Sequence, residues 1–140
     1  MKSTVVIIDG QGGKIGSLII EKLIAMTDAE LIAVGTNSIA TSAMLKAGAN
    51  YGATGENSVV VNCRDADIIV GPIGILSADS LLGEVTPVMA NAVGGSRAKK
   101  VLIPLNLEKC NLYVAGLNDL TLNEMILSAC GHIKEIIDKP

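Results

Sequence analysis

Residues 4–16 read Thr-Val-Val-Ile-Ile-Asp-Gly-Gln-Gly-Gly-Lys-Ile-Gly, and this stretch decides the fold. It begins with an uninterrupted run rich in β-branched side chains, which is typical of a strand buried on both faces. The glycines that follow predict a tight turn. From Lys14 to about Met26 apolar residues recur at helical spacing, with Glu21 and Lys22 on the opposite side. The stretch therefore predicts a buried strand, a glycine-rich loop and a helix in direct succession.

The alternation of strand and helix continues along the chain. Thr86-Pro87 places a capping residue before a proline at the first helical position, and Thr121 with Glu124 matches a capping box. The expected elements are strands over 31–35, 67–71, 101–105 and 112–115, and helices over 38–47, 87–94 and 121–138. This pattern predicts an α/β fold with a mainly parallel sheet in a three-layer α/β/α arrangement.

The segment from 50 to 64 supports two interpretations. Val59-Val60-Val61 has strand propensity, yet only about five residues separate it from the strand over 67–71, which is too few for a parallel crossover. Either the two form a hairpin, or 55–64 is a short helix after a weak strand near 50–53. We favour the helix, because Thr54 is available to cap it and the alternation is then preserved.

Composition limits the protein to a few classes. A length of 140 residues suits one domain, 1–140, and is too short for a dinucleotide-binding domain joined to a full substrate domain. The chain is 49% hydrophobic but has no Phe or Trp, so Val, Ile, Leu, Ala and Met must form the core. Few charges remain to cover the surface. We therefore expect a homodimer or higher homo-oligomer, formed through helix faces that carry Ile20, Leu76, Leu81 and Leu82.

Charge and cysteine content exclude further classes. The net charge is −3 and no basic tract is present, so we expect no nucleic-acid partner. The apolar run at the start is short and interrupted, which predicts no signal peptide, and no stretch has the length of a membrane helix. Cys63, Cys110 and Cys130 have no CxxC spacing and are expected to be reduced thiols of a cytoplasmic protein.

Ligands of parallel α/β sheets bind beyond the carboxyl ends of the strands. Glycine or a small polar residue follows each expected strand here, although short turns also select these residues without any function. The residues expected to contact a ligand are Asp9, Gly10, Gln11, Gly12, Gly13, Lys14, Ile15, Thr36, Asn37, Gly71, Pro72, Gly74 and Asn106.

The loop after the first strand suggests how a phosphate is held. Its glycines match GxGxxxG and GxxGxxG but not the strict GxGxxG, because position 15 is Ile. Glycines allow the backbone to approach a ligand closely, and the following helix offers free N–H groups and a partial positive charge. Lys14 adds a point charge. The alternative interpretation is a structural turn without a ligand.

Two features depart from the dinucleotide-binding pattern. No Asp or Glu ends the second strand, where an acidic residue would hold the ribose of NAD, and Thr36-Asn37 stands there instead. The choice between NAD, NADP and another nucleotide therefore stays open. Asp9 directly precedes the loop and would repel a pyrophosphate. It either caps the turn, binds a ribose or bridges through Mg²⁺.

The sequence contains no recognisable catalytic motif. GxSxG, HExxH, GxxxxGK[ST] and YxxxK are all missing, and the only histidine, His132, is expected to face solvent. Asp79, Glu84 and the Asn118-Asp119 loop are candidate rim groups without a defined partner. No catalytic residue or metal ligand is therefore assigned, and whether the protein is an enzyme stays open.

Several segments together resemble a known family. They are Ile8–Gly13, Gly35–Asn37, Ala47–Asn50, Gly71–Gly74 and Ile103–Asn106. This is a bacterial family of short proteins catalogued as a domain of unknown function, and the resemblance covers essentially the whole chain. It implies a cytoplasmic protein with a Rossmann-like fold but no particular activity. Through the loop glycines alone, the chain is more distantly similar to NAD(P)-binding Rossmann domains.

Three functions are consistent with these observations. The first is a small NAD(P)- or nucleotide-binding domain, acting as an oligomeric oxidoreductase or as a cofactor sensor. The second is a non-enzymatic regulatory protein that holds a different phosphorylated metabolite. The third is a structural interaction module without a nucleotide. The lack of a catalytic dyad favours binding over catalysis.

Overall fold

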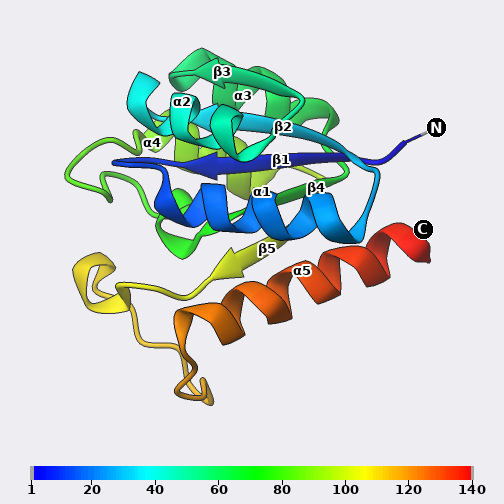
Figure 1. The fold of residues 1–140 in the computed structure, drawn as a ribbon. Coiled ribbons are helices and arrows are strands. Elements are labelled where there is room, and N and C mark those ends of the chain that lie inside the picture. Colours follow the sequence, from blue (N-terminus) through cyan, green and yellow to red (C-terminus); the bar gives the residue numbers. More distant parts are fainter. Residues whose placement is uncertain (1, 140) are drawn as a thin grey trace.

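The computed structural model describes residues 2–139, in which strands and helices alternate along the chain (Figure 1). The strands are β1 (Thr4–Asp9), β2 (Glu30–Gly35), β3 (Tyr51–Thr54), β4 (Ile68–Pro72) and β5 (Lys99–Ile103). The α-helices are α1 (Lys14–Met26), α2 (Ser38–Ala47), α3 (Glu56–Asp65), α4 (Pro87–Gly95) and α5 (Leu122–Asp138). Two 3-10 helices, η1 (Ile73–Leu76) and η2 (Leu107–Cys110), follow β4 and β5.

All strand pairs are parallel, and the strand order is β3-β2-β1-β4-β5. β1 is central: Asp9 pairs with Gly35 of β2, and Ile7 pairs with Val70 of β4. The direction of the connections reverses between β1 and β4, so the loops after these two strands diverge and leave a crevice. The predicted α/β fold with a parallel sheet is confirmed.

Alternate residues of β1 belong to two separate cores. Val5 and Ile7 pack in a cluster with α1, α2 and α5, whereas Val6 and Ile8 pack in a cluster with α3 and α4. In Figure 1, α1 and α5 lie on the near side of the sheet. Because both faces of the sheet are covered, residues 5–8 of β1 are all apolar instead of alternating with polar residues. Within residues 2–139, no helix has the length and apolar character needed to cross a bilayer.

The capping residues place the helix ends as predicted. Thr86 Oγ1 accepts a hydrogen bond from the Met89 amide at 3.1 Å. Thr121 and Glu124 form both hydrogen bonds of a capping box at the start of α5. Gly48 ends α2 with a φ of 118°, a left-handed conformation that suits glycine.

The segment from 50 to 64 follows the second interpretation. It consists of the short strand β3 and the helix α3, so a hairpin is excluded. The expected cap, however, is wrong, because Gly55 occupies the N-cap position and no side chain caps α3. The Thr54 hydroxyl lies 2.7 Å from the Thr41 hydroxyl of α2 instead. The Thr54 side chain therefore contacts α2 instead of capping α3.

The expected strand over 112–115 is also wrong, and β5 covers 99–103 instead of 101–105. After η2, residues 111–121 are all exposed, and Tyr113 is 90% exposed. Figure 1 shows this segment projecting below the body of the molecule, beside the first turn of α5. A strand needs a neighbouring strand, and within residues 2–139 none pairs with this segment, so its strand propensity has no effect.

Glycines allow α1 to approach α2 closely. A Cβ built on Gly13 would lie 2.8 Å from the carbonyl oxygen of Ala40, and Gly13 has a φ of 74°. A Cβ on Gly16 would collide with the Met44 side chain and lie 3.1 Å from the Asp9 Cβ. In contrast, a Cβ on Gly12 would meet no atom within 4 Å. Gly13 and Gly16 thus serve the fold, while Gly12 borders open space.

This difference predicts that two neighbouring substitutions change the stability by different amounts. Gly13→Ala should lower the free energy of unfolding by roughly 1–3 kcal/mol, because the added methyl meets α2 backbone and the left-handed conformation is costly for alanine. Gly12→Ala is the matched control and should change it by less than about 0.5 kcal/mol. Urea denaturation followed by circular dichroism measures both. Equal destabilisation by the two variants would contradict this view of the loop.

Candidate functional site

Asp9 organises the glycine-rich loop. Its side chain is buried, Oδ1 accepts a hydrogen bond from the Gly10 amide at 2.8 Å, and Oδ2 accepts one from the Gly16 amide at 2.7 Å. Burial raises the pKa of Asp9, while the hydrogen bonds from Gly16 and Gly10 oppose that rise. Since both carboxylate oxygens bind the backbone, the structure supports the turn-capping role over a ribose or Mg²⁺ ligand.

The outer side of the loop leaves amide groups free. Within residues 2–139, no protein atom accepts a hydrogen bond from the N–H of Gly12 or of Lys14. Lys14 is the first residue of α1, so both amides stand at a helix N-terminus, where the helix dipole favours an anion. The Lys14 side chain is exposed beside them.

Two adjoining cavities lie above the carboxyl ends of the strands. The smaller, of about 100 Å³, rests on the loop from Asp9 to Ile15. The larger, of about 430 Å³, extends over the ends of β4 and β5 towards η2. Both are lined by Gln11, Pro72, Leu81, Leu105 and Asn106. A volume of this size is within the usual range for small-molecule sites, roughly 300–1,000 Å³.

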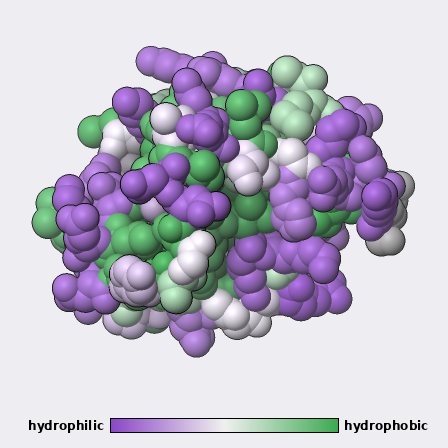
Figure 2. Space-filling view, turned by 90° about the horizontal axis from the view of Figure 1, so that it is seen from below, coloured by the Kyte–Doolittle hydropathy of each residue, from purple (hydrophilic) through white to green (hydrophobic). Residues whose placement is uncertain are grey.

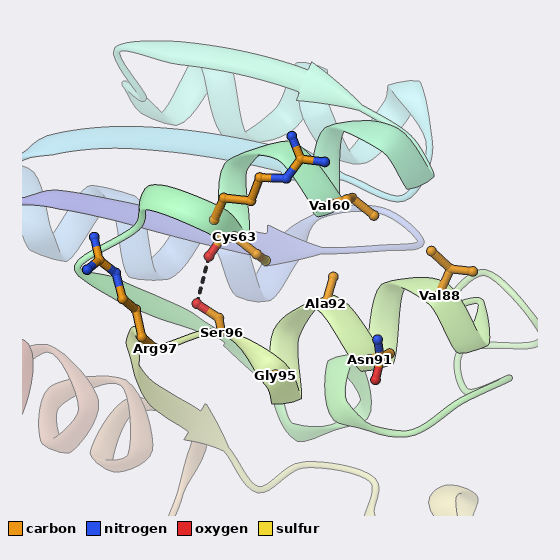
Figure 3. Close-up of a pocket in the computed structure, with 9 residues that line it drawn as sticks. Val60, Cys63, Val88, Asn91, Ala92, Gly95, Ser96 and Arg97 are labelled. Carbon is orange, nitrogen blue, oxygen red and sulfur yellow. Dashed lines mark hydrogen bonds between the residues drawn. The ribbon is translucent and has the colours of Figure 1, made fainter.

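A hollow between α3 and α4 is a competing location (Figure 3). It has a volume of about 510 Å³ and includes Val60, Val88 and Ala92. The Ser96 hydroxyl there donates to the Cys63 carbonyl at 2.6 Å and is not free for a ligand. This hollow lies between two helices and shares no lining residue with the two cavities above the strand ends. The crevice is therefore the better candidate.

Most predicted site residues line the crevice. Those that line one or both cavities are Asp9, Gly10, Gln11, Gly12, Gly13, Lys14, Ile15, Pro72, Gly74 and Asn106. Gly71 does not, because it lies buried where a Cβ would collide with the carbonyl oxygen of Ile8 in the neighbouring strand β1. The absence of a side chain at position 71 allows β4 to pair closely with β1.

Thr36 and Asn37 lie beside the loop, but they bind Glu84. The Oε1 atom of Glu84 accepts hydrogen bonds from the Thr36 hydroxyl at 2.7 Å and from the Asn37 side-chain amide at 2.8 Å. It also accepts one from the Gln11 amide at 2.8 Å. Burial acts to raise the pKa of Glu84, but these three hydrogen bonds outweigh it and the pKa is lowered.

Sequence reasoning left Glu84 without a partner, and it did not assign Leu81 or Leu105 to the site. Glu84 is 73 residues from Gln11 and 48 from Thr36. No periodicity or motif connects positions at such separations. Only one weak signal in the sequence indicated that Glu84 belongs to the site. Glu84 follows the strand over 67–71 in a fold whose ligands bind at the strand ends.

A family model described as a domain of unknown function, DUF3842, matches residues 4–138. This chain belongs to the DUF3842 family. A search of curated proteins finds no significant match.

Solved structures similar to this DUF3842 chain include the two that follow, and only the second supports a statement about its fold. One is an imine reductase variant from Myxococcus stipitatus in complex with NAD⁺, with a TM-score of 0.44, 18% identity, and coverage of 74% of this chain and 33% of that chain. The DUF3842 chain thus spans about a third of that reductase. Another is a dodecameric FMN-dependent UbiX-like decarboxylase from Escherichia coli O157:H7, with a TM-score of 0.50, 17% identity, and coverage of 96% and 92%. At such identities the likeness shows a Rossmann-like fold alone.

The cysteines of this DUF3842 chain have different surroundings. All three are free; Cys63 and Cys130 are buried, and Cys110 is half-buried at the edge of the larger cavity. Burial raises the pKa of Cys63 and of Cys130 to about 11. Among the described residues, no group of three or more His, Cys, Asp or Glu side chains is arranged to hold a metal ion.

These pKa values predict the thiol chemistry of the native protein. At pH 8 only about one in a thousand Cys63 or Cys130 groups is a thiolate, so a disulfide reagent should react rapidly with Cys110 alone. All three thiols should react after denaturation, and the slow phases should accelerate as pH rises towards 11. Cys110→Ser should remove the rapid phase. Rapid reaction of two thiols in the native wild type would contradict the assignment.

Proposed function

We propose that this DUF3842 protein binds a nucleotide or another phosphate-bearing small molecule, with a phosphate on the glycine-rich loop after β1. The observation that supports it is the pair of unpaired amides at Gly12 and Lys14, which border a cavity at the N-terminus of α1. A phosphate oxygen there would accept N–H bonds and be favoured by the helix dipole. The adjoining 430 Å³ cavity provides room for the organic part of the ligand.

The ligand candidates are NAD, NADP, adenine nucleotides and coenzyme A. FMN joins them because the UbiX-like decarboxylase, which shares the fold, is described as FMN-dependent. We infer a binding or sensing role in preference to catalysis, because the crevice contains no nucleophile paired with a base. Ser80 and Cys110 line the larger cavity, but the Ser80 hydroxyl donates to the Gly74 carbonyl, and within the described part of the chain no hydrogen bond joins the Cys110 thiol to a base. We also propose that the protein is cytoplasmic, in keeping with its three unpaired cysteines.

Self-association belongs to the same proposal, but through a different surface from the expected helix faces. Ile20 is fully buried, and Leu81 lines the crevice. Leu76 and Leu82 are exposed, but they lie in η1 and in the turn after it, not on the face of an α-helix. Exposed apolar side chains gather in the segment 111–121, and the view from the α5 side shows hydrophobic patches between hydrophilic groups (Figure 2). The exposed apolar side chains of the segment 111–121 are Leu112, Tyr113, Val114, Leu117 and Leu120. We infer that this segment contacts a second copy of the chain.

Phosphate binding is tested by two substitutions that leave the fold intact. Gly12→Ala should weaken binding of the tightest nucleotide at least tenfold, because the methyl group fills the open space in which the phosphate would lie. Lys14→Ala should weaken it less, about threefold, because one exposed charge contributes less than several N–H groups. Calorimetry and thermal shift against the candidate ligands measure both.

Protection of Cys110 provides an independent readout of the same site. A ligand in the larger cavity should slow the reaction of this thiol, because Cys110 lines that cavity. Glu56→Gln, on the exposed first turn of α3, is the control and should bind as the wild type does. Failure of every candidate ligand to bind would contradict the phosphate site and favour an interaction module.

Assembly is tested by removing apolar surface from the segment 111–121. The wild type should sediment at 28.8 kDa or more, twice the 14.4 kDa chain, at tens of micromolar, roughly the range of a specific interface. Tyr113→Ser combined with Leu117→Ser should sediment as a monomer. Ile39→Ser removes an exposed isoleucine from α2 and should leave the assembly unchanged. A monomeric wild type would contradict the proposal. Dissociation caused by Ile39→Ser would also contradict it and would indicate that the interface lies on a face of α2.

A further inference from the structure

A carboxylate from a distant turn is bound at the glycine-rich loop. Glu84 Oε1 accepts hydrogen bonds from the Gln11 amide, the Thr36 hydroxyl and the Asn37 side-chain amide, all within 2.8 Å. A loop amide, a hydroxyl and a side-chain amide are donors that an anionic ligand would use in this place. Glu84 therefore acts as an anion that the chain itself supplies.

The turn that carries Glu84 is tightly held. Asp79 donates its amide to the Val85 carbonyl at 2.7 Å, and Val85 is 1% exposed. Asp79, Leu81 and Leu82 all have left-handed backbones, with φ of 67°, 56° and 58°. Leucine is strained in this region, and strained residues cluster at functional sites. The turn thus keeps an unfavourable backbone that places Glu84 on the loop.

Glu84 closes the half of the crevice above β1 and β2. A Cβ at Gly10 would lie 2.9 Å from Glu84 Oε1 and 2.9 Å from Leu81 Cδ1, so both side chains rest against the loop. In dinucleotide-binding folds the adenosine ribose lies at the carboxyl end of the second strand. Here that strand ends at Gly35, directly before Thr36. A 2′-phosphate on such a ribose would meet the like charge of Glu84.

The half of the crevice above β4 and β5 is open. The 430 Å³ cavity there is lined by apolar Leu81, Leu82 and Leu105 and by polar residues that include Asp79, Asn106 and Lys109. It adjoins the loop on the side away from Thr36, since the two cavities share Gln11 and Pro72 but not Thr36. A phosphate on the loop amides can therefore place its organic part here without displacing Glu84.

We propose that Glu84 is the specificity-determining residue of this site and selects phosphate monoesters, such as mononucleotides, over dinucleotides that carry a 2′-phosphate. This inference rests on the proposed phosphate site and narrows its ligand class. The acidic residue missing from the end of β2 is replaced by one that arrives from the turn over 79–85. Glu84 differs from a ribose-binding carboxylate because it is already bound to the loop amide that it faces.

Calorimetric titrations with AMP, FMN, NAD and NADP test this selection. Wild-type protein should bind AMP or FMN at least tenfold more tightly than NADP, because NADP brings a further phosphate, its 2′-phosphate, to the side of the loop that Glu84 covers. Glu84→Gln keeps the side-chain length and an acceptor oxygen but removes the charge. It should raise the affinity for NADP about tenfold and that for the monophosphate by a smaller factor, because Glu84 faces the 2′-phosphate directly but is only a neighbour of the phosphate on the loop.

Two control variants separate the possible failures. Glu30→Gln removes the same charge from the other end of β2 and should leave every affinity unchanged. Gly12→Ala should weaken all probes, because it acts on the shared phosphate position. If no probe binds the wild type, both the phosphate site and the role of Glu84 are wrong.

A different result would overturn the role of Glu84 alone. In that case a monophosphate binds the wild type, and Gly12→Ala abolishes this binding. In addition, either NADP binds the wild type as tightly as the monophosphate does, or Glu84→Gln leaves the ratio of the two affinities unchanged. Circular dichroism establishes whether Glu84→Gln folds. If it does not, the wild-type ratio of NADP to monophosphate affinity decides the matter by itself.

Discussion

The buried carboxylate of Asp9 is the constraint on which the site depends. One oxygen binds the amide of Gly10 and the other binds the amide of Gly16, so a single side chain ties the end of β1 to the first turn of α1. With these bonds in place, the loop presents the amides of Gly12 and Lys14 outward. A residue with one acceptor oxygen would leave a buried N–H unpaired, which costs roughly 1–3 kcal/mol. Asp9, whose charge was expected to repel a pyrophosphate, therefore shapes the loop surface on which we propose that a phosphate binds.

Glu84 divides the crevice above the carboxyl ends of the strands. Its Oε1 atom accepts hydrogen bonds from three donors above β1 and β2, and, within the described residues, the amides of Gly12 and Lys14 stay unpaired. Its charge also acts on Asp9, since the proximity of Glu84 contributes to raising the pKa of that residue. In the proposed function the two carboxylates belong to one arrangement, in which Glu84 would repel a phosphate and the N-terminus of α1 would attract it.

The loop glycines show why a motif alone does not define a function. Gly13 and Gly16 are required by the contact between α1 and α2, and only Gly12 borders open space. The glycines of one motif thus have different roles: Gly13 and Gly16 allow close helix packing, and Gly12 borders the candidate site. A Rossmann-like fold and membership of the DUF3842 family are likewise compatible with many chemistries, because function depends on the groups placed at the strand ends.

The sequence by itself determined the elements and their order. Apolar runs, capping residues and helical spacing are local properties, so β1, the glycine-rich loop, α1, α4 and α5 could be predicted from them, as could most residues of the loop. Tertiary structure alone decided where Glu84 binds, why Gly71 and Ile20 are buried, and why Leu112–Ala115 forms no strand. Each of these outcomes depends on a neighbour distant in sequence: Glu84 meets Gln11 across 73 residues, and 112–115 has no strand beside it. Local patterns report what a segment prefers, whereas the packing of the sheet and helices decides which partners it receives.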